Sequence, residues 1–241
     1  MSLFTHKKNL ADLFEGFTDF HCHILPGVDD GVQTFEDSAR ILSVYSELGV
    51  RKVFLTPHIM EDVPNRPDGL KARFQELKDF LEKGGVKAPE LELASENMMD
   101  NLFAERLASR ELLTLGGEHL LVETSYYNPP LNLQETLFQV KSAGYRPVLA
   151  HPERYIYMDD RDYADLKKKN ILFQLNLSSL SGFYGSTAQK KAESMLKKGY
   201  YDFAGTDLHR YSMFSSYRKV KLPAGLWNQL SELMKSSAGR I

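Results

Sequence analysis

Short apolar segments alternate with amphipathic segments along the whole chain. Seven segments have the length and apolar content of buried strands, and they cover residues 18–24, 52–56, 90–95, 120–123, 147–150, 171–177 and 201–205. Segments with apolar residues at helical spacing lie between and after them, at residues 34–48, 70–81, 132–143, 188–198 and 226–235. Such regular alternation of strands and helices predicts a parallel sheet.

Both ends of the first helical segment are marked in the sequence. Thr34 can cap its amino end, Ile41 and Tyr45 lie one helical turn apart, and Gly49 ends it. Seven strands that each end in polar residues favour a barrel variant over an open sheet, because barrel enzymes carry their sites at this end. We therefore expect a single α/β domain.

The length of the chain agrees with one barrel. Its 241 residues, 42% of them hydrophobic, can bury one large core. We assign residues 17–241 to the barrel, with residues 226–235 as a covering helix at the carboxyl end. Residues 1–16 are expected to be an N-terminal extension, either a short docking helix or partly foreign to the natural chain.

Charge and cysteine content exclude several classes of protein. The net charge of −2 gives no basic bias toward nucleic acid or an anionic membrane. Cys22 is the only cysteine, so no intramolecular disulfide can form, which suits a reducing compartment. No segment approaches the ~20 apolar residues that span a bilayer, and residues 1–16 lack the apolar core of a signal peptide. We expect a cytoplasmic protein that neither binds nucleic acid nor inserts into a membrane.

Histidine and acidic residues gather where the predicted strands end. Five of the seven histidines and three acidic residues occupy such positions: His21, His23, His58, Glu96, Glu123, His151, Asp207 and His209. Alternation along a strand predicts that Asp19, His21 and His23 share one face and that Cys22 lies on the other. The first and last strands of a barrel are neighbours, so the histidine pair after the first should meet Asp207 and His209 after the last.

This set of residues has the chemistry of a metal centre. Mixed imidazole and carboxylate ligands suit Mn, Fe or Zn better than Ca or Mg. Eight ligands exceed what one ion needs, so two or three ions that share carboxylates are expected. Such clusters generate hydroxide and hold both the attacking and the leaving oxygen of a displacement at phosphorus.

Six motifs in this order resemble the polymerase and histidinol phosphatase (PHP) superfamily. They read HCHILPGVDDG, TPH, LELASEN, LLVE, HPER and TDLH, and the first resembles, more narrowly, the bacterial capsule and exopolysaccharide tyrosine-protein phosphatases. The resemblance covers residues 17–210. It implies a distorted (β/α)7 barrel with a manganese-type cluster, held by the eight residues named above, that hydrolyses phosphotyrosine. It further implies that the partner is a membrane-bound tyrosine kinase with a tyrosine-rich tail in a polysaccharide export system.

The resemblance also assigns arginines to the substrate. It places the phosphate-holding arginine at Arg154 of HPER, whose fork of donors matches phosphate; the alternative is an ordinary surface ion pair. The family usually carries a further arginine after its last motif, and here Arg210 or Arg218 could serve. We name Arg210 as the candidate.

Four other polar residues admit two interpretations each. Cys22 follows a histidine as in cysteine phosphatases, but position 28 holds Val where their arginine would stand, so we expect a buried apolar filler. Asp19 could orient a ligand histidine or cap its strand. Asp29 and Asp30 could serve the turn before Gly31 or lie at the mouth of the site.

Aromatic residues gather in the expected loops after the strands. Most should pack at the rim, and one or two could form the wall of a slot for a phenyl ring; they are Tyr126, Tyr127, Tyr155, Tyr157, Phe183 and Tyr184. His6 and His119 fall outside the pattern and are expected to be structural or exposed.

The sequence thus predicts a metal-dependent phosphomonoesterase, and specifically a protein-tyrosine phosphatase. Arg154, Asp207 and His209 are the predicted catalytic residues. The loops at residues 125–130 and 152–159 are short, which predicts a shallow, open site. The alternatives are a small-molecule phosphatase, such as one acting on histidinol phosphate, and a catalytically silent scaffold that binds phosphotyrosine.

Overall fold

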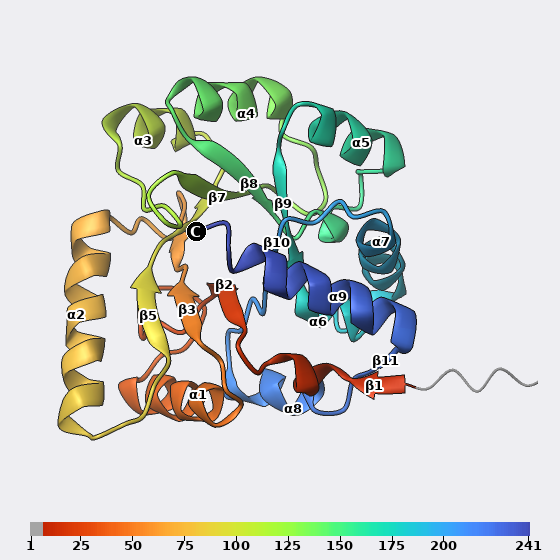
Figure 1. Cartoon of the computed structure of the whole chain (residues 1–241). Helices are drawn as coiled ribbons and strands as arrows, with labels where there is room; N and C mark the ends of the chain where they lie inside the picture. Colours follow the sequence, from red (N-terminus) through yellow and green to blue (C-terminus); the bar gives the residue numbers. More distant parts are fainter. Residues whose placement is uncertain (1–6) are drawn as a thin grey trace, which may run out of the picture.

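Parallel strands curl into a distorted barrel in the computed structural model, which describes residues 7–241 (Figure 1). The barrel strands lie at or near the predicted positions: β2 (Thr18–Cys22), β3 (Lys52–Leu55), β4 (His58–Ile59), β5 (Glu90–Leu93), β6 (Glu96–Met98), β7 (His119–Glu123), β8 (Arg146–Ala150), β9 (Leu172–Asn176) and β10 (Phe203–Gly205). They form a three-stranded sheet in the order β2-β3-β5 and a six-stranded sheet in the order β10-β9-β8-β7-β6-β4.

Two breaks and one bridge join these sheets into a barrel. β3 and β4 are halves of one interrupted strand, as are β5 and β6, and each first half lies in one sheet while each second half lies in the other. On the other side β10 leads into a segment beside β2, where Asp207 N donates to His21 O (2.7 Å) and His23 N donates to Leu208 O (2.9 Å). The predicted single-domain barrel is confirmed.

Helices lie outside the strands (Figure 1). The α-helices are α1 (Phe35–Glu47), α2 (Pro67–Lys83), α3 (Phe103–Ser109), α4 (Leu133–Ser142), α5 (Asp160–Lys168), α6 (Leu177–Leu180), α7 (Gly185–Lys197), α8 (Phe214–Tyr217) and α9 (Ala224–Ser237). Short 3-10 helices occur at η1 (Leu10–Leu13), η2 (Pro152–Arg154) and η3 (Tyr211–Met213). Thr34 caps α1 as predicted, because its Oγ1 accepts from Asp37 N at 3.2 Å.

Apolar side chains fill the barrel below its carboxyl end. Phe20 stacks on Phe54 with ring centroids 5.4 Å apart and tilts against Phe203 at 4.9 Å. Residues from β7, β8 and β9, together with Ala94 and Leu115, complete this inner cluster. A larger cluster contains the apolar residues of the helices and of the opposite strand faces. The inner cluster leaves only the carboxyl end of the barrel for polar chemistry.

A bulge in β2 overturns one prediction. The register between β2 and β3 shifts between Asp19 and Cys22, so Asp19 faces Tyr45 of α1, whose hydroxyl donates to it at 2.7 Å. The prediction that Asp19 shares a face with His21 is therefore wrong, because strict alternation does not survive a bulge.

A strand near the amino end of the chain pairs with the strand that precedes α9. β1 (Lys7–Asn9) pairs antiparallel with β11 (Lys221–Pro223), and Leu10 and Leu13 of η1 are buried. Residues 7–13 of the predicted extension therefore pack against the rest of the protein; residues 1–6, with His6, lie outside the described residues, and the division at residue 17 stays a prediction. Among residues 7–241, no helix combines the length and apolar content needed to cross a membrane.

Candidate metal centre

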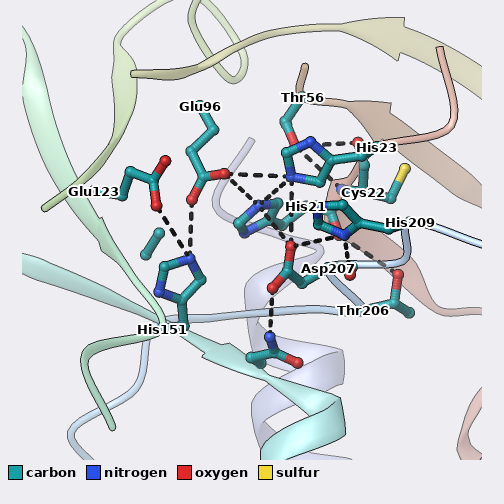
Figure 2. A network of polar contacts seen from close by, with 12 residues as sticks. His21, Cys22, His23, Thr56, Glu96, Glu123, His151, Thr206, Asp207 and His209 are labelled. Carbon is teal, nitrogen blue, oxygen red and sulfur yellow. Dashed lines mark hydrogen bonds and ion pairs between the residues drawn. The ribbon is translucent and has the colours of Figure 1, made fainter. Parts of the chain in front are cut away.

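The eight predicted ligands converge at the carboxyl end of the barrel, and Figure 2 labels all of them except His58. They come from β2, β4, β6, β7 and from the segments that follow β2, β8 and β10. Seven of the eight residues are buried, and the side chain of His209 is 19% exposed. Residues far apart in the sequence thus present nitrogen and oxygen atoms to one small space.

One group of possible metal ligands lies between the first and last strands. It contains His21, His23, Glu96 and Asp207, whose ligand atoms lie within 4.8 Å of one another. Glu96 Oε2 is 3.1 Å from His21 Nε2 and 3.3 Å from His23 Nε2. Both imidazole nitrogens lie 3.4 Å from Asp207 Oδ1. The expected meeting of the two residue pairs occurs at this point.

A second group shares Glu96 with the first. His58 Nδ1 lies 3.2 Å from Glu96 Oε2 and 3.1 Å from Glu123 Oε1. These three atoms are buried, and none has a hydrogen-bond partner. His151 lies beside this group, with Nε2 2.9 Å from Glu96 Oε1 and 3.9 Å from Glu123 Oε2.

A third group adds a residue that we did not predict as a ligand. Asp30 Oδ1 lies 3.5 Å from the Nε2 atoms of both His58 and His209, and His23 completes the group. The sequence signal was present in the pair Asp29–Asp30 of HCHILPGVDDG, but a turn before glycine accounts for such a pair equally well.

The electrostatics of these groups require positive charge. Burial would lower the pKa of His21, yet the carboxylates of Glu96 and Asp207 raise it to about 9. Burial would raise the pKa of Glu96, yet the imidazoles of His21 and His58 hold it well below its usual range. Positive charge therefore suits these groups, and a cation could supply it, because metal ligation takes the neutral imidazole.

Neighbouring residues fix the orientation of the histidines. His21 Nδ1 lies 2.9 Å from Gln174 Oε1, and His23 Nδ1 lies 2.8 Å from Asp29 Oδ2. When each Nδ1 donates to its partner, the lone pair of Nε2 faces the centre. Asp29 also accepts from Gly31 N at 2.9 Å, so it serves both the turn and the site. Gln174 was missed; its one signal was a polar residue inside an apolar strand.

Two candidate ligands have a strained backbone. His151 has φ 33° and Asp207 has φ 51°, both in the left-handed region that disfavours residues with a side chain. Such conformations cost of order 1–3 kcal/mol and are concentrated at functional sites. Here they turn each side chain toward the cluster directly after its strand.

Arg154 joins the metal-ligand cluster to an open pocket. Its Nη1 donates to Asp207 Oδ2 at 2.8 Å, and its guanidinium lies 4.2 Å from the ring centre of Tyr126 and 3.9 Å from that of Tyr184. The pocket has a volume of about 230 Å³ and is lined also by Arg210. Arg218 is exposed and is not among the lining residues.

Comparison with known proteins agrees with this geometry. The family described as "Capsular polysaccharide synthesis, CpsB/CapC" matches residues 17–219. The chain belongs to this family.

Curated relatives carry the name tyrosine-protein phosphatase. YwqE of Bacillus subtilis is 27% identical over 195 residues, which cover 79% of this chain and 76% of the relative. CpsB of Streptococcus pneumoniae is 25% identical over 202 residues, which cover 79% and 82%. The solved structure of these two proteins, described as unique metal-dependent tyrosine phosphatases, has a TM-score of 0.74 at 24% identity and covers 91% of this chain and 94% of that one. The resemblance and the fold that it implies are confirmed.

Cys22 and His119 lie outside the candidate metal centre, and both are buried. Cys22 is buried, its thiol lies 3.3 Å from Phe54 O, and burial raises its pKa well above its usual range (Figure 2). Such a thiol is neither ionised nor accessible, which agrees with the predicted filler role. His119 is buried at the start of β7 and packs edge-on against Phe203, so it is structural.

Proposed function

We propose that this member of the CpsB/CapC family is a metal-dependent protein-tyrosine phosphatase. The observation that carries the proposal is the set of three overlapping ligand groups, with three buried and unpartnered atoms, beside a pocket lined by Arg154 and Arg210. The names of the relatives support the same activity.

We assign the metal ligands residue by residue. The eight predicted residues, with Asp30 added, would hold two or three ions. Manganese suits the mixed imidazole and carboxylate ligands, and iron or zinc are the alternatives. When bound, the ions would supply Lewis-acid chemistry, which activates water and neutralises charge on the phosphoryl oxygens.

The chain's own residues then position the phosphoryl group. Arg154 has donors besides the one held by Asp207, and these can bind phosphoryl oxygens as negative charge grows on them. Arg210 is the proposed second contact. Asp207 and His209 hold the centre in place and, by that route, the reacting atoms. A phenolate leaves with a pKa near 10, so the reaction needs no dedicated general acid.

The size of the pocket favours a phosphorylated protein over a small molecule. A volume of about 230 Å³ is below the ~300–1,000 Å³ of a site that encloses a whole small ligand. It suits a phosphate and part of a ring whose protein chain continues into solvent. We propose a tyrosine kinase of capsule or exopolysaccharide synthesis as the substrate, which would place the reaction in the cytoplasm.

Kinetics on three substrates test this function. In one manganese buffer, kcat/KM should be highest for a phosphotyrosine peptide, lower for the matching phosphoserine peptide and lower for histidinol phosphate. Asp207→Asn and His209→Ala should each lower kcat by about 100-fold or more, roughly 3 kcal/mol of barrier, with the fold retained in circular dichroism. A kcat/KM for histidinol phosphate above that for every phosphotyrosine peptide would support the small-molecule alternative. Binding of phosphotyrosine peptide without hydrolysis of any substrate would support the silent scaffold.

A further inference from the structure

Tyr126, Phe183 and Tyr184 line the pocket, and the rings of two of them contact the guanidinium of Arg154. Tyr126 and Tyr184 each turn a ring face to its guanidinium. The Tyr126 hydroxyl lies 3.5 Å from Glu123 Oε2, and that of Tyr184 lies 3.3 Å from Asp207 Oδ2. These two rings therefore support the guanidinium, and the faces that they use are unavailable to a substrate.

Phe183 is different, because most of its ring is open to the pocket and to solvent. It is 54% exposed, although a phenyl ring has no polar atom that gains from contact with water. The ring packs edge-on against Tyr184, with centroids 5.0 Å apart and an interplanar angle of 87°. A single exposed apolar side chain is common on protein surfaces; this one lines the pocket, so a ligand that enters the pocket can cover it.

The backbone around Phe183 holds the ring in this place. Phe183 N donates to Ser178 O at 3.3 Å and to Ser181 Oγ at 3.2 Å. Gly182 and Gly185, on either side, have φ 79° and 88°, in the left-handed region that glycine adopts without strain. The turn between α6 and α7 thus presents the side chain instead of burying it.

We propose that Phe183 is the specificity-determining residue that packs against the phenyl ring of the substrate. The inference rests on the proposed phosphatase function and names the part of the site that would distinguish aryl from alkyl phosphates. A phosphate beside Arg154 and the ligand groups leaves its ester oxygen and ring toward the rim, where Phe183 stands. Aromatic pairs prefer edge-to-face or offset contacts, which the free part of the Phe183 ring can offer.

Exposure alone does not carry this inference, and the chain provides a matched control. Tyr127 is 71% exposed and lies in the loop after β7, yet it is not among the residues that line the pocket. Truncation of Tyr127 removes a comparable exposed ring near the site. A small ligand that reaches only the pocket should distinguish the two positions.

Competitive inhibition by two phosphonates isolates the contribution of the ring. Phenylphosphonate and methylphosphonate share the phosphoryl-like group, and only the first carries a ring. With the manganese-loaded protein and p-nitrophenyl phosphate as reporter substrate, the ratio of the methylphosphonate Ki to the phenylphosphonate Ki measures discrimination. Phe183→Ala should lower this ratio by about 3- to 10-fold, the range of one aromatic pair. Phe183→Tyr and Tyr127→Ala should leave it within about twofold.

The outcomes separate the inference from the function. Phe183→Leu keeps an apolar side chain without a ring, so a ratio as low as in Phe183→Ala supports an aromatic contact. An unchanged ratio in Phe183→Ala, with unchanged thermal midpoint and manganese content, overturns the inference and leaves the phosphatase function intact. An equal fall in Tyr127→Ala overturns it as well. A wild-type protein that hydrolyses no aryl phosphate with manganese, iron or zinc overturns both.

Discussion

At the scale of single residues, the two oxygens of one carboxylate can have different partners. Asp207 faces His21 and His23 with Oδ1, while its Oδ2 accepts from Arg154 and, at 2.7 Å, from Asn176 Nδ2. One carboxylate therefore faces both the candidate ligand group and the pocket beside Arg154. The sequence predicted Asp207 from its place after a strand. Asn176, like Gln174, stands out only as a polar residue in an apolar strand, and that signal does not identify its partner on another strand.

Replacement of Arg154 tests the pocket directly. Arg154→Ala should lower kcat/KM for a phosphotyrosine peptide by about 10- to 1,000-fold, because it removes a donor to the charge that grows on the phosphoryl group. Arg154→Lys should recover only part of this, since an ammonium cannot make a two-pronged contact or stack between two rings in the same way. Steady-state kinetics at constant manganese content measure both effects.

Two further arginines provide comparison and control. Arg210→Ala should reduce kcat/KM by less than Arg154→Ala, because Arg210 lines the pocket but is exposed. Arg218→Ala should have no effect, since Arg218 lies outside the lining residues. If none of the three substitutions changed kcat/KM, the arginines would not bind the phosphate. If Arg218→Ala alone lowered kcat/KM, the second phosphate contact would be Arg218 and not Arg210.

Replacement of Cys22 tests which class of phosphatase chemistry operates. Cys22→Ser should keep most of its turnover, because the thiol faces Phe54 O and the apolar layer, away from the centre. The added polarity should cost about 1–2 kcal/mol of unfolding free energy, which chemical denaturation can measure. Lost activity in a variant with normal folding and metal content would reinstate a cysteine nucleophile.

At the scale of elements, the sequence predicted where strands end better than how they pair. Each predicted strand is present, yet the strand predicted at residues 52–56 continues after a break as β4, and at the break Pro57 cannot donate a ladder hydrogen bond. The break transfers the strand from one sheet to the other. Asp19 was misplaced for a related reason, since a bulge is a feature of the pair of strands and cannot be read from one strand alone.

The 3-10 helix η2 offers a test of how an element positions the pocket. Glu153 in η2 is 1% exposed and accepts from Asn176 N at 3.1 Å, Ser179 Oγ at 2.8 Å and Tyr201 OH at 3.0 Å. Glu153→Ala would leave these donors unpaired and should lower the unfolding free energy by about 2–4 kcal/mol. It should also raise KM through the neighbouring Arg154.

A nearby exposed carboxylate is the control for Glu153. Asp160 has a side chain that is 67% exposed and pairs with Lys198 at 2.7 Å. Asp160→Ala should change stability by less than about 1 kcal/mol, as for surface ion pairs in general, and should leave kinetics unchanged. If Glu153→Ala and Asp160→Ala changed the unfolding free energy and KM by the same amounts, Glu153 would not have a positioning role.

At the scale of the whole molecule, local patterns predicted the barrel but not the pairing of β1, near the amino end, with β11. Regular alternation of strands and helices indicated the fold, and the resemblance narrowed it to seven strands. The pairing of β1 with β11 had no signal, because both are three-residue strands without an alternating apolar pattern. Such a pair forms only when the folded barrel brings the two segments together.

The buried ligand groups should couple metal content to the stability of the entire barrel. Ions that bind only the folded state stabilise it by about 2.7 kcal/mol per site when free metal is 100-fold above its Kd, which corresponds to a rise in thermal midpoint of roughly 5–10 °C for a domain of this size. We expect manganese to raise the midpoint of chelator-treated protein by that amount and more than magnesium does, because imidazole suits manganese better.

Glu96→Gln should lose most of the shift, since Glu96 belongs to two of the three groups, while Cys22→Ser should keep it. Differential scanning calorimetry before and after chelation measures the shift; equal midpoints for wild-type protein with and without manganese, iron or zinc would show that these side chains hold no ion that matters to the fold.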